Sequence, residues 1–347
     1  MGENIELIVR GIILESVLVS VIMANYKTKI EYLREAIESI LNQTYSNFEL
    51  IIVDDCSQDE SLTYIQSLKD PRVRVYVNET NSGPAVTRNK GFLEARGKYI
   101  AIMDSDDISM PTRLEKQVAY MENNPDVIVC GTWFEKFGVE NKTRKPIIDD
   151  FEMYRCQLLF SDTPITLCSP SAMIRKSMLD DNSIRYDETL LKTEDYGLWV
   201  ACSKVARFYI IKDVLIKYRT HVNQTSIIDK SEQCEYANLI SRRQLQDLGI
   251  EFIEEEKRWR YDIVPSYRDY LHFYQWIIQL ERANTAYGIY NQDAFKRYLE
   301  IKLSNAIKRL SSLDKIKILF GSNARSVKLF IRLTKSMFDR RIKKQRV

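Results

Sequence analysis

Apolar runs of strand length alternate with helically spaced apolar positions over roughly the first 132 residues. Val17–Met23 is a continuous apolar run, as expected for a buried parallel strand. The other strand-like runs are Leu50–Val53, Val73–Val77, Tyr99–Met103 and Val127–Thr132. Helical spacing appears between the runs, first at Leu33, Ile37, Ile40 and Leu41. This alternation predicts a doubly wound α/β sheet with helices on both faces.

Local signals predict where several of these helices begin. Thr28-x-x-Glu31 has the form of a capping box at the start of the first helix. Ser61–Leu68 has the length of a short helix, and Pro84 suits the first turn of a longer one. Pro111 is expected to open another helix. From about residue 230 strand-like runs fade, so we predict an α/β domain over 1–229 and a mostly helical region over 230–347.

The charge of the chain is unevenly distributed. Residues 302–347 carry 14 Lys and Arg against Asp314 and Asp339, although the whole chain has a net charge of only +3. This split indicates a basic tail that meets an anionic partner, either a lipid surface or nucleic acid. Between Arg325 and Val347 the apolar residues recur at near-helical intervals, which predicts a helix that lies on an anionic membrane or packs on the protein.

Cysteine usage and hydropathy indicate the cellular compartment. The six cysteines are scattered without a Cys-x-x-Cys pair, which argues against a disulfide framework and against a zinc site. The N-terminus lacks a basic stretch ahead of an apolar core, so it does not resemble a secretion signal. No apolar run reaches the roughly 18 residues of a membrane-spanning helix. We therefore expect a cytoplasmic protein that lies on the inner face of the membrane.

Polar side chains follow three of the predicted strands, at the point where each strand ends. They are Asn25 and Tyr26 after the first strand, Asp54 and Asp55 after the second, and Asp104 and Asp106 after the fourth. Ligands of doubly wound sheets bind outside the carboxyl ends of the strands, so these residues are expected to share one crevice. The chain has neither a Gly-x-Gly-x-x-Gly nor a Walker-type loop, which argues against the usual dinucleotide and phosphate-loop sites.

The acidic run Asp104-Ser105-Asp106-Asp107 is the first candidate for chemistry. Three carboxylates within four residues repel one another unless a cation lies among them. Oxygen ligands of this kind favour Mg²⁺ or Mn²⁺, which are typically shared with substrate phosphates. A solvated turn with a helix N-cap explains the same residues, since Asp is common there.

The remaining candidates also have two interpretations each. Asp55 could accept the N3–H of a uracil and Tyr26 could stack on the base, or both could be ordinary strand-end residues. In Glu194-Asp195 one carboxylate could take a proton from an acceptor hydroxyl, or the pair could simply favour a helix N-terminus. His221 is one of two histidines, and a lone histidine is usually a packed or surface residue.

Together these stretches resemble glycosyltransferase family 2, whose members have the GT-A fold. Five segments match in order and spacing: VSVIMANYK (19–27), SILNQTYSNFELIIVDDCSQD (39–59), NSGPAVTRNKGFLEARGKYIAIMDSDDISMPTRLEKQV (81–118), TEDYGLWV (193–200) and YRTHVNQTS (218–226). The resemblance covers about residues 17–226. It implies a mixed, mainly parallel sheet, with a nucleotide-sugar half at about 17–132 and an acceptor half at about 133–229.

The resemblance also implies roles for individual residues. The nucleotide site would comprise Ala24, Asn25, Tyr26, Asp55, Arg88, Asp104 and Ser105. The metal, Mn²⁺ or Mg²⁺, would be held by Asp106 with help from Asp104 and His221. Asp195 matches the catalytic base, with Glu194 beside it. The implied reaction is an inverting transfer from a UDP-sugar to a glycan or lipid-linked acceptor in the synthesis of a bacterial surface polysaccharide such as O-antigen, lipopolysaccharide or capsule.

Two departures from the family pattern and three rival functions bear on this resemblance. Residues 168–177 lack the glycine usual in the sugar-pocket loop, and the Gln/Arg-x-x-Arg-Trp motif of processive synthases is missing, which favours addition of one sugar at a time.

A sugar-1-phosphate nucleotidyltransferase would show a glycine-rich basic loop after the first strand, which is absent here. A non-catalytic carbohydrate-binding or assembly protein would have lost carboxylates that this chain keeps. Nucleic-acid binding has no recognised motif.

Overall fold

The computed structural model describes residues 17–160, 167–221, 230–251, 253–259, 261–320 and 327. Within them the chain forms two compact units. The first contains the described residues up to Asp149 and those from Leu167 to Tyr236. The second contains Asp150–Phe160 and the described residues from Ala237 onward. No helix among the described residues is long and apolar enough to cross a membrane.

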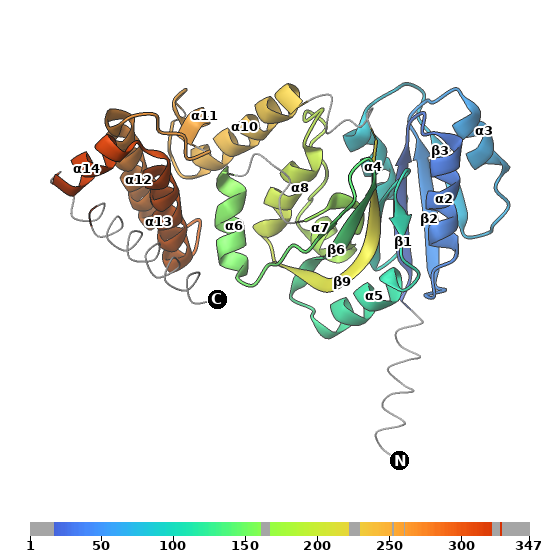
Figure 1. Cartoon of the computed structure of the whole chain (residues 1–347). Coiled ribbons are helices and arrows are strands. Elements are labelled where there is room, and N and C mark those ends of the chain that lie inside the picture. Colours follow the sequence, from blue (N-terminus) through green and yellow to red (C-terminus); the bar gives the residue numbers. More distant parts are fainter. Residues whose placement is uncertain are drawn as a thin grey trace, which may run out of the picture. The chain divides into compact units, whose positions relative to one another are not determined.

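The first unit is built on one mixed sheet, in which the described residues supply nine strands (Figure 1). The strand order is β3-β2-β1-β4-β8-β6-β9-β5, and β7 pairs with β6. The strands are β1 (Val19–Asn25), β2 (Phe48–Asp54), β3 (Val73–Val77), β4 (Tyr99–Asp104), β5 (Ile108–Ser109), β6 (Val127–Gly138), β7 (Lys142–Arg144), β8 (Met173–Arg175) and β9 (Arg207–Thr220).

The four strands predicted first lie side by side and run parallel. β1 pairs with β2 and β4, and β2 pairs with β3, all in parallel register. Strand β8 then enters antiparallel between β4 and β6, and β6 continues parallel with β9. The fold class expected from the sequence, a mixed and mainly parallel GT-A-like sheet with flanking helices, is confirmed.

Helices cover both faces of this sheet because β1, β2 and β4 are apolar on both sides. One face packs against α2 (Ile30–Leu41), α3 (Glu60–Ser67) and α5 (Arg113–Asn123), through Leu33, Ile37, Ile65 and Leu114 among others. The other face of β1 meets α4 (Pro84–Glu94), where Ile22 lies against Gly91. The remaining helices of the unit are η1 (Ser169–Ser171), α7 (Lys176–Asp181) and α8 (Glu194–Ser203).

The structure corrects two predicted helix starts. Helix α5 begins at Arg113 after the N-cap Thr112, and not at Pro111. Helix α2 begins at Ile30 after Lys29, and its N-cap forms no side-chain hydrogen bond, so the predicted capping box is wrong. The Thr28 hydroxyl instead lies 2.7 Å from the hydroxyl of Ser105, in the acidic run after β4. A contact with a residue 77 positions away has replaced the local cap.

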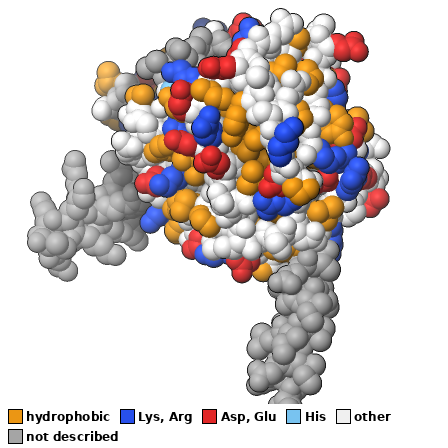
Figure 2. All heavy atoms as spheres, turned by 90° about the vertical axis from the view of Figure 1, so that its right-hand side faces the viewer, with side chains coloured by type: hydrophobic (Ala, Val, Ile, Leu, Met, Phe, Trp, Pro, Cys, Tyr) orange, Lys and Arg blue, Asp and Glu red, His pale blue; other side chains and the backbone are white. Residues whose placement is uncertain are grey.

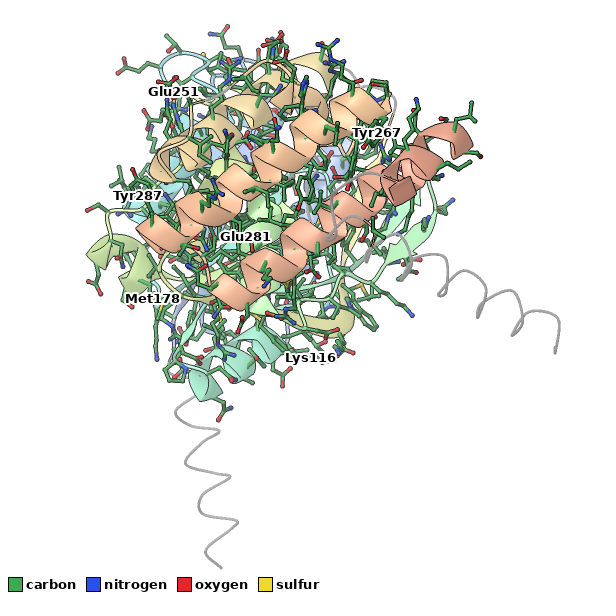
Figure 3. The ribbon with its side chains drawn as sticks, turned by 90° about the vertical axis from the view of Figure 1, so that its left-hand side faces the viewer. Lys116, Met178, Glu251, Tyr267, Glu281 and Tyr287 are labelled. Atoms are coloured by element: carbon green, nitrogen blue, oxygen red, sulfur yellow. The ribbon has the colours of Figure 1, made fainter. Side chains whose placement is uncertain are left out.

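The second unit is helical. Its elements are α6 (Phe151–Phe160), α10 (Lys230–Asp247), α11 (Glu256–Trp259), α12 (Tyr267–Tyr287), α13 (Gln292–Arg309) and α14 (Ser312–Phe320), although the first seven residues of α10 belong to the first unit. Helices α12 and α13 lie side by side (Figure 3). Ser266 and Asn291 accept the capping hydrogen bonds at their N-termini. The predicted C-terminal helices are confirmed for the described residues, which end at 320 apart from Val327.

Helix α6 belongs to this second core although the sequence places it before residue 230. Cys156, Leu159 and Phe160 pack among Trp259, Phe273 and Trp276 of the C-terminal helices. The hydroxyl of Ser241 also bonds to the Leu159 carbonyl. The expected acceptor half at 133–229 is therefore interrupted by a segment that packs elsewhere. Apolar spacing within α6 indicates a buried face but does not say which core buries it.

Surface charge on the described residues is mixed. On the face that Figure 2 shows, Lys and Arg side chains are interspersed with Asp and Glu. The predicted amphipathic helix between Arg325 and Val347 lies outside the described residues apart from Val327. It stays a prediction.

Candidate active site

The carboxyl ends of β1, β2 and β4 bring the predicted site residues to one edge of the sheet. In the parallel register Ala24 lies beside Val53 and Asp104, and Asn25 lies beside Asp54. Ala24 is partly exposed at this edge, and the Tyr26 ring beyond it is 47% exposed. The convergence that the sequence predicted is therefore present, with an accessible aromatic ring at its rim.

Asp55 is held by the segment that leads into α4. The side-chain amide of Asn78 and the backbone N–H of Ser82 donate to its Oδ1 at 2.8 and 2.9 Å, and the N–H of Gly83 donates to Oδ2 at 2.8 Å. Gly83 has φ of 86°, a left-handed conformation that favours glycine. Among the described residues one donor is found for Oδ2, and a carboxylate oxygen can accept two hydrogen bonds, so Oδ2 has capacity for another donor such as the N3–H of a base.

Asn25 and Asp54 have a different position from the one expected. Asn25 is buried, and its amide donates to Asp54 Oδ1 at 2.6 Å and to the hydroxyls of Ser57 and Ser61. Asp54 in turn accepts from the backbone and hydroxyl of Ser57. Asn25 was predicted to bind nucleotide, but its side chain lies beneath the edge and supports the loop after β2.

The three carboxylates of the acidic run at 104–107 have three different partners. Asp104 Oδ1 accepts from Arg88 at 2.9 Å, and Asp106 Oδ2 lies 3.1 Å from His221 Nε2. Asp107 is buried, and its Oδ1 accepts from the backbone N–H of Arg219 at 2.7 Å. Burial, together with the charge of Asp104, raises the pKa of Asp106. Burial and the neighbouring carboxylates raise the pKa of Asp107 well above its usual range.

This arrangement fits a divalent cation as a partial site. Burial, and then the neighbouring carboxylates, disfavour the charged forms of Asp106 and Asp107, and a bound cation would offset both effects. Asp106 and His221 offer an oxygen and a nitrogen from segments 115 residues apart. No set of three His, Cys, Asp or Glu side chains in the described part of the chain forms a complete metal cage. Mg²⁺ typically takes one or two carboxylates and completes its shell with water and substrate phosphates.

Arg88 connects this loop to the first turn of α8. Its guanidinium donates to Asp104 Oδ1 at 2.9 Å and to Glu194 Oε1 at 2.5 Å. Its side chain is only 12% exposed, so both ion pairs are poorly hydrated. Glu194 is therefore committed to Arg88, which leaves its neighbour Asp195 as the candidate base.

Asp195 has the properties of a general base. Apart from the backbone N–H of Tyr196 at 2.8 Å, no hydrogen bond to its carboxylate is found in the described part of the chain. Burial, and then the charge of Glu194, raise the pKa of Asp195 to about 7, while Arg88 acts in the opposite direction. A general base works best with a pKa near the working pH. Just before α8, Thr193 has φ of 58°, a strained left-handed conformation for a β-branched residue.

Ser105, which the sequence predicted, shares a hydrogen bond with the Thr28 hydroxyl. Two further residues of the site were not predicted. Asn78 and Arg219, which bind Asp55 and Asp107, were not expected. Asn78 is one residue beyond a predicted strand, and Arg219 is two residues before His221. Their positions at strand ends were the available signal.

Comparison with known proteins is consistent with this geometry. The profile of Glycosyl transferase family 2 matches residues 20–182. An uncharacterised glycosyltransferase of Methanocaldococcus jannaschii is 38% identical over 231 residues, which cover 64% of this chain and 78% of its own. One from Haemophilus influenzae is 31% identical over 252 residues, covering 67% and 76%. The chain belongs to glycosyltransferase family 2. This membership argues against the nucleotidyltransferase alternative.

Solved structures show the same fold. The crystal structure of S. aureus TarS 1–349 in complex with UDP-GlcNAc superposes with a TM-score of 0.53, 17% identity, and coverage of 83% of this chain and 90% of that chain. A longer TarS chain is matched over 54% of its length. At this identity the likeness establishes the fold alone.

Proposed function

We propose that this glycosyltransferase moves one sugar from a UDP-sugar to an acceptor hydroxyl with inversion at the anomeric carbon. One observation carries the proposal. Arg88 connects Asp104, at the nucleotide edge, to the helix turn that presents Asp195, a carboxylate with one hydrogen bond in the described residues and a pKa of about 7. Arg88 therefore contacts both Asp104, which is suited to binding the donor, and the helix turn that carries Asp195, which is suited to activating the acceptor.

The donor would lie along the edge formed by β1, β2 and β4. The open lone pair on Asp55 suits the N3–H of uracil, and the exposed Tyr26 ring offers a stacking surface beside Ala24. The TarS structure that shares this fold contains UDP-GlcNAc, which supports a uridine nucleotide here. We assign Asp104 and Ser105 to the ribose side of the donor and Arg88 to the wall of the pocket.

A divalent cation, Mn²⁺ or Mg²⁺, would be held by Asp106 and His221, with Asp104 nearby. When bound, it supplies positive charge that stabilises the diphosphate leaving group. The protein's own step is the proton transfer. Asp195 accepts the proton of the acceptor hydroxyl, whose oxygen forms the new bond to the anomeric carbon as the bond to the diphosphate breaks. One displacement with one base forms no covalent intermediate, so an α-linked donor would give a β-linked product.

The acceptor belongs to the same proposal. We assign it to the glycan or lipid-linked class used in surface polysaccharide synthesis, at the cytoplasmic face of the membrane. The support is the excess of cations in residues 325–347, where nine Lys and Arg accompany one acid, Asp339, because each cation near an anionic membrane contributes about 1 kcal/mol of attraction. A lipid-linked acceptor would give this placement a purpose, since enzyme and substrate would share one surface.

A donor screen tests the central claim without knowledge of the acceptor. Purified full-length protein is incubated with Mn²⁺ and a panel of UDP-, GDP- and dTDP-sugars, and release of the free nucleotide is measured. We expect hydrolysis confined to one or two UDP-sugars and lost in EDTA. Hydrolysis of only GDP- or dTDP-sugars would refute the uridine assignment, and full activity in EDTA would refute the metal. A protein that binds UDP-sugars but never hydrolyses or transfers them would fit the non-catalytic alternative.

A further inference from the structure

Arg219 is a charged side chain in the first unit to which the reaction just described gives no role. It lies near the end of β9 and is 9% exposed. Its guanidinium carbon lies 4.2 Å from the ring centre of Tyr32 in α2 and 4.4 Å from that of Phe137 in β6. It also pairs with Glu35, one turn beyond Tyr32 on α2. The guanidinium is thus held by two rings and a carboxylate.

Arg219 also donates two hydrogen bonds to the acidic run at 104–107. Its Nε–H donates to the backbone carbonyl of Asp106 at 2.7 Å, and its backbone N–H donates to Asp107 Oδ1 at 2.7 Å. Two residues further on, His221 Nε2 lies 3.1 Å from Asp106 Oδ2. The end of β9 therefore contacts both the main chain and the carboxylate of Asp106.

We propose that Arg219 is a positioning residue that sets the orientation of the Asp106 carboxylate and its alignment with His221. The inference rests on the proposed metal site, because it concerns how tightly that site can bind a cation. A guanidinium has donors in fixed directions within one plane, so the two rings packed against it fix where Nε–H points. Groups that orient metal ligands in this way typically change metal affinity about 10- to 100-fold when removed.

Lysine provides the sharpest substitution. Arg219→Lys keeps the positive charge and most of the stem, and the backbone bond to Asp107 does not depend on the side chain. An ammonium has no planar group to pack against the two rings, so they would no longer hold a donor in line with the Asp106 carbonyl. Glu35→Gln is the matched control, since it weakens the outer ion pair and leaves the bond to Asp106. The Glu35 side chain is 52% exposed, and exposed pairs contribute little.

The experiment measures binding of Mn²⁺ to the full chain in the presence of UDP, by electron paramagnetic resonance of free Mn²⁺, and the melting temperature of each variant. We expect Arg219→Lys to weaken Mn²⁺ binding about 10- to 100-fold at a melting temperature within a few degrees of wild type. Glu35→Gln should change it by about fivefold or less. Equal Mn²⁺ affinity in Arg219→Lys and wild type would overturn the inference.

Two further outcomes are a variant that does not fold and a wild-type protein that binds no Mn²⁺. If Arg219→Lys does not fold, Mn²⁺ binding is measured instead in Phe137→Leu, which removes one of the two rings beside Arg219, with Phe137→Tyr as its control. Weaker Mn²⁺ binding in the leucine variant alone supports the inference, and equal binding overturns it. A wild-type protein that binds UDP but no Mn²⁺ would refute the proposed metal and this inference together. Failure of the inference alone is distinct, since wild type then binds Mn²⁺ and the variants match it.

Discussion

Replacing Arg88 by glutamine tests whether its charge sets the ionisation of Asp195, the proposed catalytic base. Arg88 lies in two poorly hydrated ion pairs, and it lowers the pKa of Asp195, which burial and the charge of Glu194 raise to about 7. Arg88 is bonded to Glu194, the neighbour of Asp195, so we take its charge to lie about 8 Å from the Asp195 carboxylate, where an effective dielectric constant of about 20 gives roughly 2 kcal/mol. Its loss should raise the pKa of Asp195 by about 1.5.

The consequence is a change in the acid limb of the pH profile. A general base must be deprotonated, so activity rises with pH through the pKa of Asp195 and is lost below it. With a pKa of about 7, half of the wild-type enzyme is active at pH 7. A pKa higher by about 1.5 leaves roughly 3% active at that pH, which is a decrease of about 15-fold. Raising the pH to about 9 should recover most of this loss.

The assay is kcat/KM for transfer measured from about pH 5.5 to about 9.5, because this quantity reports the ionisations of the free enzyme, the state that the structure describes. Arg88→Lys is the control, since it keeps the charge near Glu194 and should leave the midpoint close to wild type. An Arg88→Gln profile with an unchanged midpoint, or one moved to lower pH, would refute the reasoning. A loss that is uniform at every pH would indicate that Arg88 only positions the donor.

Three further changes test the remaining assignments. Asp106→Asn should abolish divalent-dependent hydrolysis of the donor and leave the circular dichroism spectrum unchanged; an active, metal-independent variant would remove the metal from the mechanism. Asp195→Asn should lower transfer at least ~100-fold while donor affinity measured by calorimetry stays near wild type. If transfer survives in Asp195→Asn and Glu194→Gln is inactive, the two carboxylates have exchanged roles. The intact chain should float with anionic liposomes at low salt, whereas a chain ending near Asn323 should not, and equal behaviour of the two would show that the tail is no anchor.

Much of this protein follows from local sequence pattern. Continuous apolar runs such as Leu50–Val53 are found in buried parallel strands, because a strand covered on both faces needs no polar side. The carboxyl ends of such strands share one edge, so the sequence alone places together the residues that follow them, including Asp55 and Asp104. The order of five weak motifs then identified the family, which the comparisons confirmed.

The tertiary structure alone decided which polar groups are already occupied. Asn25 and Asp55 both follow the strand-end rule and both are buried, yet their partners differ: the Asn25 amide donates to Asp54, Ser57 and Ser61 within the loop after β2, whereas Asp55 accepts from the segment that leads into α4. Glu194 and Asp195 are adjacent carboxylates, and in the described part of the chain Glu194 is the one that pairs with Arg88, 106 residues away. Apolar periodicity reports how far a residue is buried. It does not report its hydrogen-bond partner, because partners are brought together by chain segments whose separation no local pattern records.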